Sequence, residues 1–81
     1  MSADLIPIRM PDLGDVTKAV VVQWLRTVDS QLSEGDDLLE VETEKTTFVI
    51  PAPVSGRLVT IHAPEMTAVT TERILGEIDP G

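Results

Sequence analysis

The sequence predicts one small all-β domain, a sandwich or flattened barrel, and three observations lead to this prediction. Short apolar strand-like runs alternate with closely spaced turn signals, a pattern typical of all-β domains. No segment shows a convincing apolar period of about 3.6 residues, which an amphipathic helix would need. The 81-residue chain also contains an internal repeat. Two copies are too few for a solenoid, so the repeat indicates a single domain with quasi-twofold symmetry.

The repeat superposes the segment that begins at Ala19 on the segment that begins at Gly56, without a gap and at an offset of 37 residues. Apolar residues recur at matching positions, namely Val21 with Leu58, Val22 with Val59, Trp24 with Ile61, Leu32 with Val69, Leu38 with Leu75 and Val41 with Ile78. We expect the core between the two sheets to include Val22, Trp24, Val41, Leu58, Ile61 and Ile78, because they are apolar at repeat-matched positions.

Strands are expected in chain order at residues 6–10, 19–25, 38–42, 46–50, 57–61 and 74–78. Pro7 restricts the first of these to the edge of a sheet, because proline cannot donate a ladder hydrogen bond. Turns are expected at 27–31 and 33–36, and Gly35 can take the positive φ that the second requires. Segment 68–75 is ambiguous and is compatible with a helical turn. The expected domain covers residues 6–79, with 1–5 as an N-terminal extension and 80–81 as the start of a linker.

Composition excludes several classes of function. Fourteen acidic residues against six basic ones give a net charge of −8. This balance argues against surfaces for nucleic acid or anionic membranes, which need basic patches. The absence of cysteine excludes disulfides and thiolate metal sites. No apolar run approaches the roughly 20 residues of a membrane span, and the first residues do not resemble a signal peptide.

Catalytic and metal-binding constellations are also lacking. His62 is the only histidine, so it has no second histidine or cysteine as a partner. The acidic residues between Asp36 and Glu44 lack the spacing of a calcium loop, and no glycine-rich phosphate loop is present. The sequence therefore predicts a domain that is not an enzyme and has no metal site.

Lys45 is the most informative residue, because it is one of only two lysines and lies in a polar tetrapeptide between two strand-like runs. A tight hairpin with Lys45 at or near its tip is the simplest geometry. A solvated lysine is a poor general base, since nothing desolvates its amine. It is a good point of attachment for a carried group. A solubilising turn residue is the alternative interpretation.

The chain resembles the lipoyl domains of the acyltransferase component of 2-oxo acid dehydrogenase complexes. The motifs that carry the resemblance are residues 10–15 (MPDLGD), 22–25 (VQWL), 34–46 (EGDDLLEVETEKT) and 52–58 (APVSGRL). It implies two four-stranded sheets with quasi-twofold symmetry and lipoic acid in amide linkage on Lys45. It further implies that Glu42, Glu44 and Thr46 contribute to recognition by the modifying enzyme. The loop residues Asp12, Leu13, Gly14 and Asp15 would contribute to recognition by partner enzymes.

Two departures from the family pattern bear on the turns. Asp29 replaces a turn glycine, and aspartate tolerates positive φ. Met66 stands at the repeat-related position, where positive φ would cost roughly 1–2 kcal/mol. We therefore expect the second half, between Ala63 and Arg73, to adopt a different loop. The family also usually has Asp-Lys-Ala where this chain has Glu44-Lys45-Thr46.

The resemblance implies a non-catalytic carrier with several protein partners. These are a thiamin-diphosphate-dependent decarboxylase, the acyltransferase core, dihydrolipoamide dehydrogenase and a lipoate ligase or lipoyl transferase. The isolated domain is expected to be a monomer. It would work in the cytoplasm of a bacterium or archaeon, or in the mitochondrial matrix of a eukaryote. Two alternatives stay open: a biotinyl carrier domain, and an unmodified interaction module of the same fold.

Overall fold

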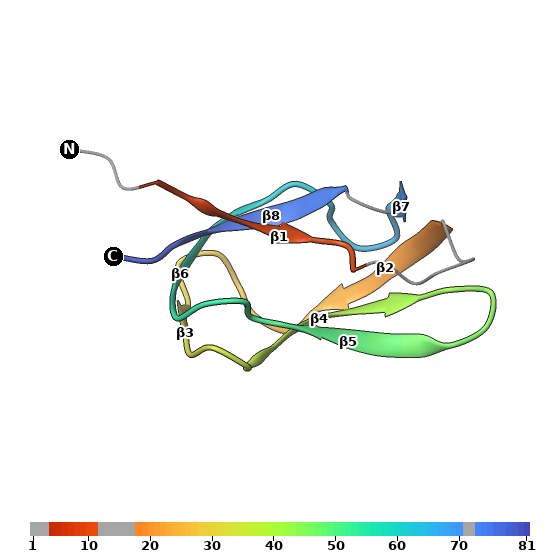
Figure 1. Cartoon of the computed structure of the whole chain (residues 1–81). Coiled ribbons are helices and arrows are strands. Elements are labelled where there is room, and N and C mark those ends of the chain that lie inside the picture. The colour runs from red at the N-terminus through yellow and green to blue at the C-terminus, as the bar shows by residue number, and fades with distance from the viewer. Residues whose placement is uncertain (1–3, 12–17, 71–72) are drawn as a thin grey trace.

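A computed structural model describes residues 4–11, 18–70 and 73–81 of the chain. These residues form eight strands in an elongated body of 41 × 20 × 19 Å (Figure 1). The strands are β1 (Ile6–Arg9), β2 (Lys18–Trp24), β3 (Gln31–Leu32), β4 (Asp37–Glu42), β5 (Thr47–Pro51), β6 (Gly56–Ile61), β7 (Ala68–Thr70) and β8 (Ile74–Asp79). The described part of the chain contains no helix long and apolar enough to cross a membrane.

The strands form two antiparallel sheets of four strands each, as the resemblance to lipoyl domains implies. One sheet has the order β1-β8-β6-β3 and the other the order β5-β4-β2-β7. The six expected strands are all present within one residue of their predicted bounds. The short strands β3 and β7 complete the eight strands that the resemblance implies, but the residue patterns did not locate them. The helical turn considered for segment 68–75 is wrong for residues 68–70, because β7 pairs with β2.

Hydrogen bonds repeat at the same offset of 37 residues as the sequence. The Asp29 amide donates to the Leu58 carbonyl at 2.7 Å, and the repeat-related Met66 amide donates to the Val21 carbonyl at 2.7 Å. In the same way the Leu25 amide donates to the Leu38 carbonyl, and the His62 amide donates to the Leu75 carbonyl. The sequence repeat therefore reflects a quasi-twofold symmetry of the backbone.

The expectation of a different loop in the second half is wrong at its central residue. Met66 has φ 67°, close to the 76° of its counterpart Asp29. The reason is the hydrogen bond from the Met66 amide to Val21, because it ties this turn to the opposite half of the molecule. Met66 keeps the strained conformation although its side chain is 78% exposed and gains little from packing.

Replacement of Met66 by glycine is expected to stabilise the domain. Glycine removes a strain of roughly 1–2 kcal/mol at positive φ. Part of that gain is lost because glycine has more conformational freedom in the unfolded chain, so the free energy of unfolding should rise by about 0.5–1 kcal/mol. Chemical denaturation measures the change. Glu65→Gly, one residue earlier and also exposed, is the matched control and should destabilise. If both variants lose stability, Met66 is not strained.

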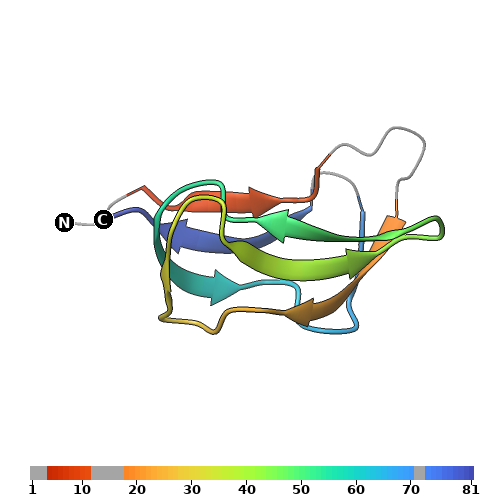
Figure 2. The ribbon, with the colours of Figure 1, turned by 90° about the horizontal axis from the view of Figure 1, so that it is seen from below.

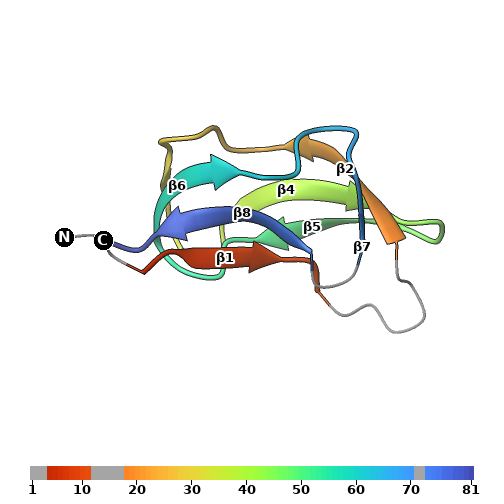
Figure 3. The same ribbon diagram turned by 90° about the horizontal axis from the view of Figure 1, so that it is seen from above.

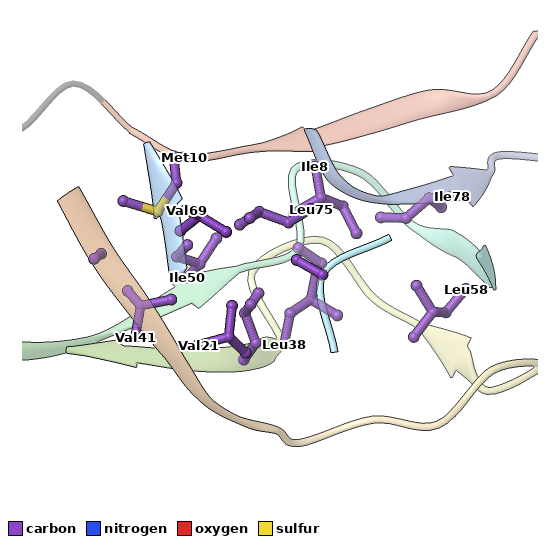
Figure 4. Packing of buried hydrophobic residues seen from close by; sticks show 14 of the residues in the cluster. Ile8, Met10, Val21, Leu38, Val41, Ile50, Leu58, Val69, Leu75 and Ile78 are labelled. Atoms are coloured by element: carbon purple, nitrogen blue, oxygen red, sulfur yellow. The ribbon is translucent and has the colours of Figure 1, made fainter. Parts of the chain in front are cut away.

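Aliphatic side chains from both sheets fill the space between them (Figure 4). Val41, Leu58 and Ile78 are fully buried there, as predicted. Val21 is also fully buried, whereas Val22 is only half-buried. The prediction of Val22 as a core residue is therefore wrong. The register between β2 and β4 shifts between Val21 and Gln23, and this irregularity breaks the strict alternation of the strand.

Trp24 and Ile61 are half-buried and pack against the core. The tip of the Trp24 ring reaches the inner face of the opposite sheet, as predicted, because a Cβ atom at Gly76 of β8 would lie 3.2 Å from Trp24 Cη2. The Trp24 indole donates from Nε1 to the Ala63 carbonyl at 2.7 Å. A partly buried indole N–H needs such an acceptor, and the loop after β6 provides one through Ala63, whose side chain is buried. Trp24 therefore joins the two halves of the repeat by a polar contact as well as an apolar one.

Candidate functional site

The β4–β5 hairpin extends from one end of the elongated body (Figures 2 and 3). The start of β1 and the end of β8 lie at the opposite end. Glu42 and Thr47 are the last paired residues of the hairpin, so residues 43–46 form its tip. Glu44 and Lys45 are the two central residues of the turn, and neither has a positive φ. The sequence-based prediction of Lys45 at a hairpin tip is confirmed.

Thr43 fixes the conformation of this tip. Its amide donates to the Thr46 carbonyl at 2.7 Å and closes the turn. Its hydroxyl oxygen Oγ1 accepts hydrogen bonds from the amides of Lys45 at 3.1 Å and Thr46 at 3.0 Å. The hydroxyl also donates to the Thr46 carbonyl at 3.0 Å. Because the Thr43 hydroxyl takes the place of a backbone hydrogen-bond acceptor, the turn can form without a glycine.

Thr43 is the only polar or charged side chain in the described part of the chain that is buried, at 9% exposure. Thr43 was not among the site residues predicted from the sequence. A signal was present, because a threonine two residues before the lysine can form a side-chain-to-backbone turn. The side chain of Thr46 or Glu44 could equally have supplied the hydrogen bonds of such a turn, so the spacing alone did not identify Thr43.

The side chain of Lys45 is exposed. Among the described residues, the ion pairs involve Arg26 and Arg57, a further contact joins His62 to Glu77, and none of these includes Lys45. The amine is therefore not held against the protein by a neighbouring carboxylate of those residues. A primary amine in this setting is open to an enzyme that forms an amide bond on it.

Of the other predicted recognition residues, Glu42, Glu44 and Thr46 are all exposed and within three residues of Lys45. Glu42 and Glu40 share the outer face of β4, and Gln23 donates to the Glu40 carboxylate at 3.2 Å. Glu40 and Glu42 thus form an acidic stripe on β4 beside the hairpin tip. The predicted partner-recognition residues, namely Asp12, Leu13, Gly14 and Asp15, lie outside the described residues, so that prediction stays a prediction.

The remaining candidates take structural positions. Lys18 is exposed at the start of β2, where it pairs with Thr70 of β7. His62 Nε2 forms a hydrogen bond with a Glu77 carboxylate oxygen at 2.9 Å, on the surface of the other sheet. Each belongs to a strand ladder or its margin and is not part of the hairpin tip.

Removal of the Thr43 hydroxyl should loosen the hairpin tip. Thr43→Val keeps the shape of the side chain and leaves the amides of Lys45 and Thr46 without their acceptor. We expect a loss of about 1–2 kcal/mol in the free energy of unfolding. Thr43→Ser keeps the hydroxyl and is the matched control. Amide hydrogen exchange at Lys45 and Thr46 should accelerate in Thr43→Val and stay near wild type in Thr43→Ser. Equal exchange in both variants would contradict the role of the hydroxyl.

Comparison with known proteins gives one family match and several similar relatives. A family model described as "Biotin-requiring enzyme" matches residues 6–78. The chain is 37% identical over 75 residues to the dihydrolipoyllysine-residue succinyltransferase component of the 2-oxoglutarate dehydrogenase complex of Bartonella vinsonii, which covers 91% of the chain and 18% of that protein. It is 40% identical over 67 residues to the dihydrolipoyllysine-residue acetyltransferase component of the pyruvate dehydrogenase complex of Mycobacterium bovis, which covers 82% and 12% respectively. The chain thus spans less than a fifth of the length of these relatives.

Among solved structures, the lipoyl domain of the 2-oxoglutarate dehydrogenase complex from Azotobacter vinelandii is similar. The TM-score is 0.77 at 21% sequence identity, over 94% of this chain and 98% of the other. The two proteins therefore share the same fold.

Proposed function

The chain belongs to the biotin–lipoyl family, whose model matches residues 6–78, and from this premise we propose that it is a lipoyl carrier domain with lipoic acid attached to Lys45. The observation that carries the proposal is the position of Lys45, an exposed lysine at the tip of a hairpin whose turn is fixed by Thr43. The names of the similar relatives refer to a dihydrolipoyllysine residue, which favours lipoate over biotin.

The role of the chain itself is presentation. When attached, lipoic acid supplies a dithiolane that can take up and release acyl groups and electrons. Lys45 contributes the amine nitrogen that forms the amide. Thr43 holds the turn in one conformation, so the attached group would swing from a fixed base. Because β1 starts and β8 ends at the far end of the body, connections to other domains would leave the hairpin tip unobstructed.

The proposed partners are the enzymes of a 2-oxo acid dehydrogenase complex. A thiamin-diphosphate-dependent decarboxylase, an acyltransferase core and a dihydrolipoamide dehydrogenase would visit Lys45 in turn. A tether turns such encounters into intramolecular ones, at an effective concentration on the order of mM for a short flexible linker. The net charge of −8 would speed encounter with basic surfaces on these enzymes.

A biotinyl carrier is the second candidate, because the description of the matching family model names biotin. The test is intact mass after expression of the domain with lipoate and a lipoate ligase, and separately with biotin and a biotin ligase. We expect a mass increase of one lipoyl group in the first sample and none in the second. Modification by biotin alone would replace the proposal with a biotinyl carrier. No modification in either sample would leave an interaction module of the same fold.

Glu44 should matter to the modifying enzyme more than to the fold. Its side chain is exposed beside Lys45, and exposed substitutions usually shift stability by only about ±0.5 kcal/mol. Glu44→Ala is therefore expected to leave the melting temperature nearly unchanged and to slow lipoylation in a time course followed by mass. Glu34→Ala, at an exposed turn outside the hairpin, should leave the rate unchanged. A large drop in melting temperature would show that Glu44 is structural.

A further inference from the structure

Each of the two sheets ends in two edge strands, and three of these four edges are poorly suited to pair with another chain. The edge β1 contains Pro7 in its centre, which removes a backbone donor. The edges β3 and β7 have only two and three residues. The fourth edge, β5, has five residues and no proline before its last position. In the described part of the chain, β4 is its only strand neighbour.

The quasi-twofold symmetry shows which backbone groups of β5 face outward. Val49 pairs with Glu40, and Pro7 pairs with Glu77, which lies 37 residues after Glu40. Val49 and Pro7 are therefore equivalent positions in the two halves. Proline is tolerated within a sheet where its missing N–H would point away from the neighbouring strand. The N–H of Val49 accordingly points away from β4.

The hydrogen bonds of the hairpin lead to the same conclusion. The Thr46 carbonyl accepts from the Thr43 amide, so residue 46 directs its backbone groups toward β4. Successive residues of an antiparallel strand direct these groups alternately toward the partner and away from it. Thr47 and Val49 therefore direct theirs away from β4. This edge begins two residues after Lys45.

Side chains along the edge indicate what would pair with it. On the outer face, Val49 is 40% exposed and Thr47 is exposed, with Glu40 and Glu42 directly beside them on β4. On the inner face, Phe48 is half-buried at the margin of the core. A strand added to β5 would lie about 5 Å from it. Its outer residues would lie beside Thr47 and Val49 and on the same side of the sheet as the acidic stripe, about 10 Å from β4 and within reach of long basic side chains. Its inner residues would contact Phe48.

From these observations we propose that the edge of β5 is a docking site for an extended segment of a partner protein in which basic and apolar residues alternate. The segment would add a strand beside Thr47 and Val49, a known mode of peptide recognition. A second copy of this chain fits less well, because it would bring the same net charge of −8 and the same acidic stripe. The proposal does not require Lys45 to be modified.

The test is a titration of the isotope-labelled domain with a capped octapeptide that alternates lysine and valine. We expect saturable binding that weakens with salt, together with slower hydrogen exchange at the Thr47 and Val49 amides. The same peptide with its edge-facing amides N-methylated should bind at least about tenfold more weakly, since it loses one to two hydrogen bonds. A peptide with glutamate in place of lysine should not bind.

Two variants of the domain complete the test. Val49→Pro places in β5 the residue that β1 already holds at the equivalent position, and it should weaken binding by a similar factor. Val49→Thr keeps the N–H and should bind like wild type. The proposal is overturned if the N-methylated or glutamate peptide binds as well as the original, if Val49→Pro binds normally, or if no peptide binds. Dimerisation of the free domain through β5 would overturn it in favour of a second copy.

Discussion

Lys45→Arg is expected to abolish attachment of lipoate while leaving the fold intact. Arginine keeps the positive charge, but its guanidinium stays protonated and offers no nucleophilic nitrogen. Lys45 is exposed and forms no ion pair with the described residues. The free energy of unfolding should therefore change by no more than about 0.5 kcal/mol. Intact mass and thermal unfolding measure the two effects on the same sample.

Lys18→Arg is the matched control, because Lys18 is the only other lysine of the chain. Lys18 is the first residue of β2, in the part of that strand that pairs with β7, and it does not lie at the hairpin tip. This variant should be modified to the same extent as wild type, and peptide mapping should place the group on Lys45. A modified Lys45→Arg protein with the group on Lys18 would show that the hairpin does not determine the site.

Gly56→Ala should produce the largest loss of stability among single substitutions of small residues. Gly56 has φ 155°, in a region that side chains rarely adopt. A Cβ atom there would lie 2.3 Å from the Asp79 carbonyl oxygen and 2.9 Å from Ile78 Cγ2. Because the nearest atom belongs to the backbone of β8, it cannot move aside alone. Backbone strain and steric overlap together should cost about 3–5 kcal/mol.

Gly35→Ala separates these two contributions. Gly35 also has a positive φ, 92°, but nothing lies within 4 Å of the position where its Cβ would stand. This variant should therefore lose only the conformational part, about 1–2 kcal/mol. Chemical denaturation of both variants gives the difference. Equal losses of stability in the two variants would contradict the proposed steric overlap between a side chain at position 56 and the backbone of β8.

The sequence by itself determined the fold class, six of the strands, the symmetry and the place of Lys45. These features depend on local patterns that leave few alternatives. Apolar alternation defines a strand, a polar tetrapeptide between two strands defines a hairpin, and a gapless repeat defines the symmetry. The positive φ of Gly35 was predictable for the same reason, because glycine is the residue that such a turn favours.

Only the tertiary structure decided the features that depend on partners distant in the chain. Met66 adopts a strained φ because its amide bonds to Val21. Val21 is buried in place of Val22 because the register shifts against β4. The edge of β5 stands out only when all four edges are compared. In each case a local conformational preference of roughly 1–2 kcal/mol competes with long-range hydrogen bonds and burial. A sequence pattern reports the local preference but not the long-range contacts.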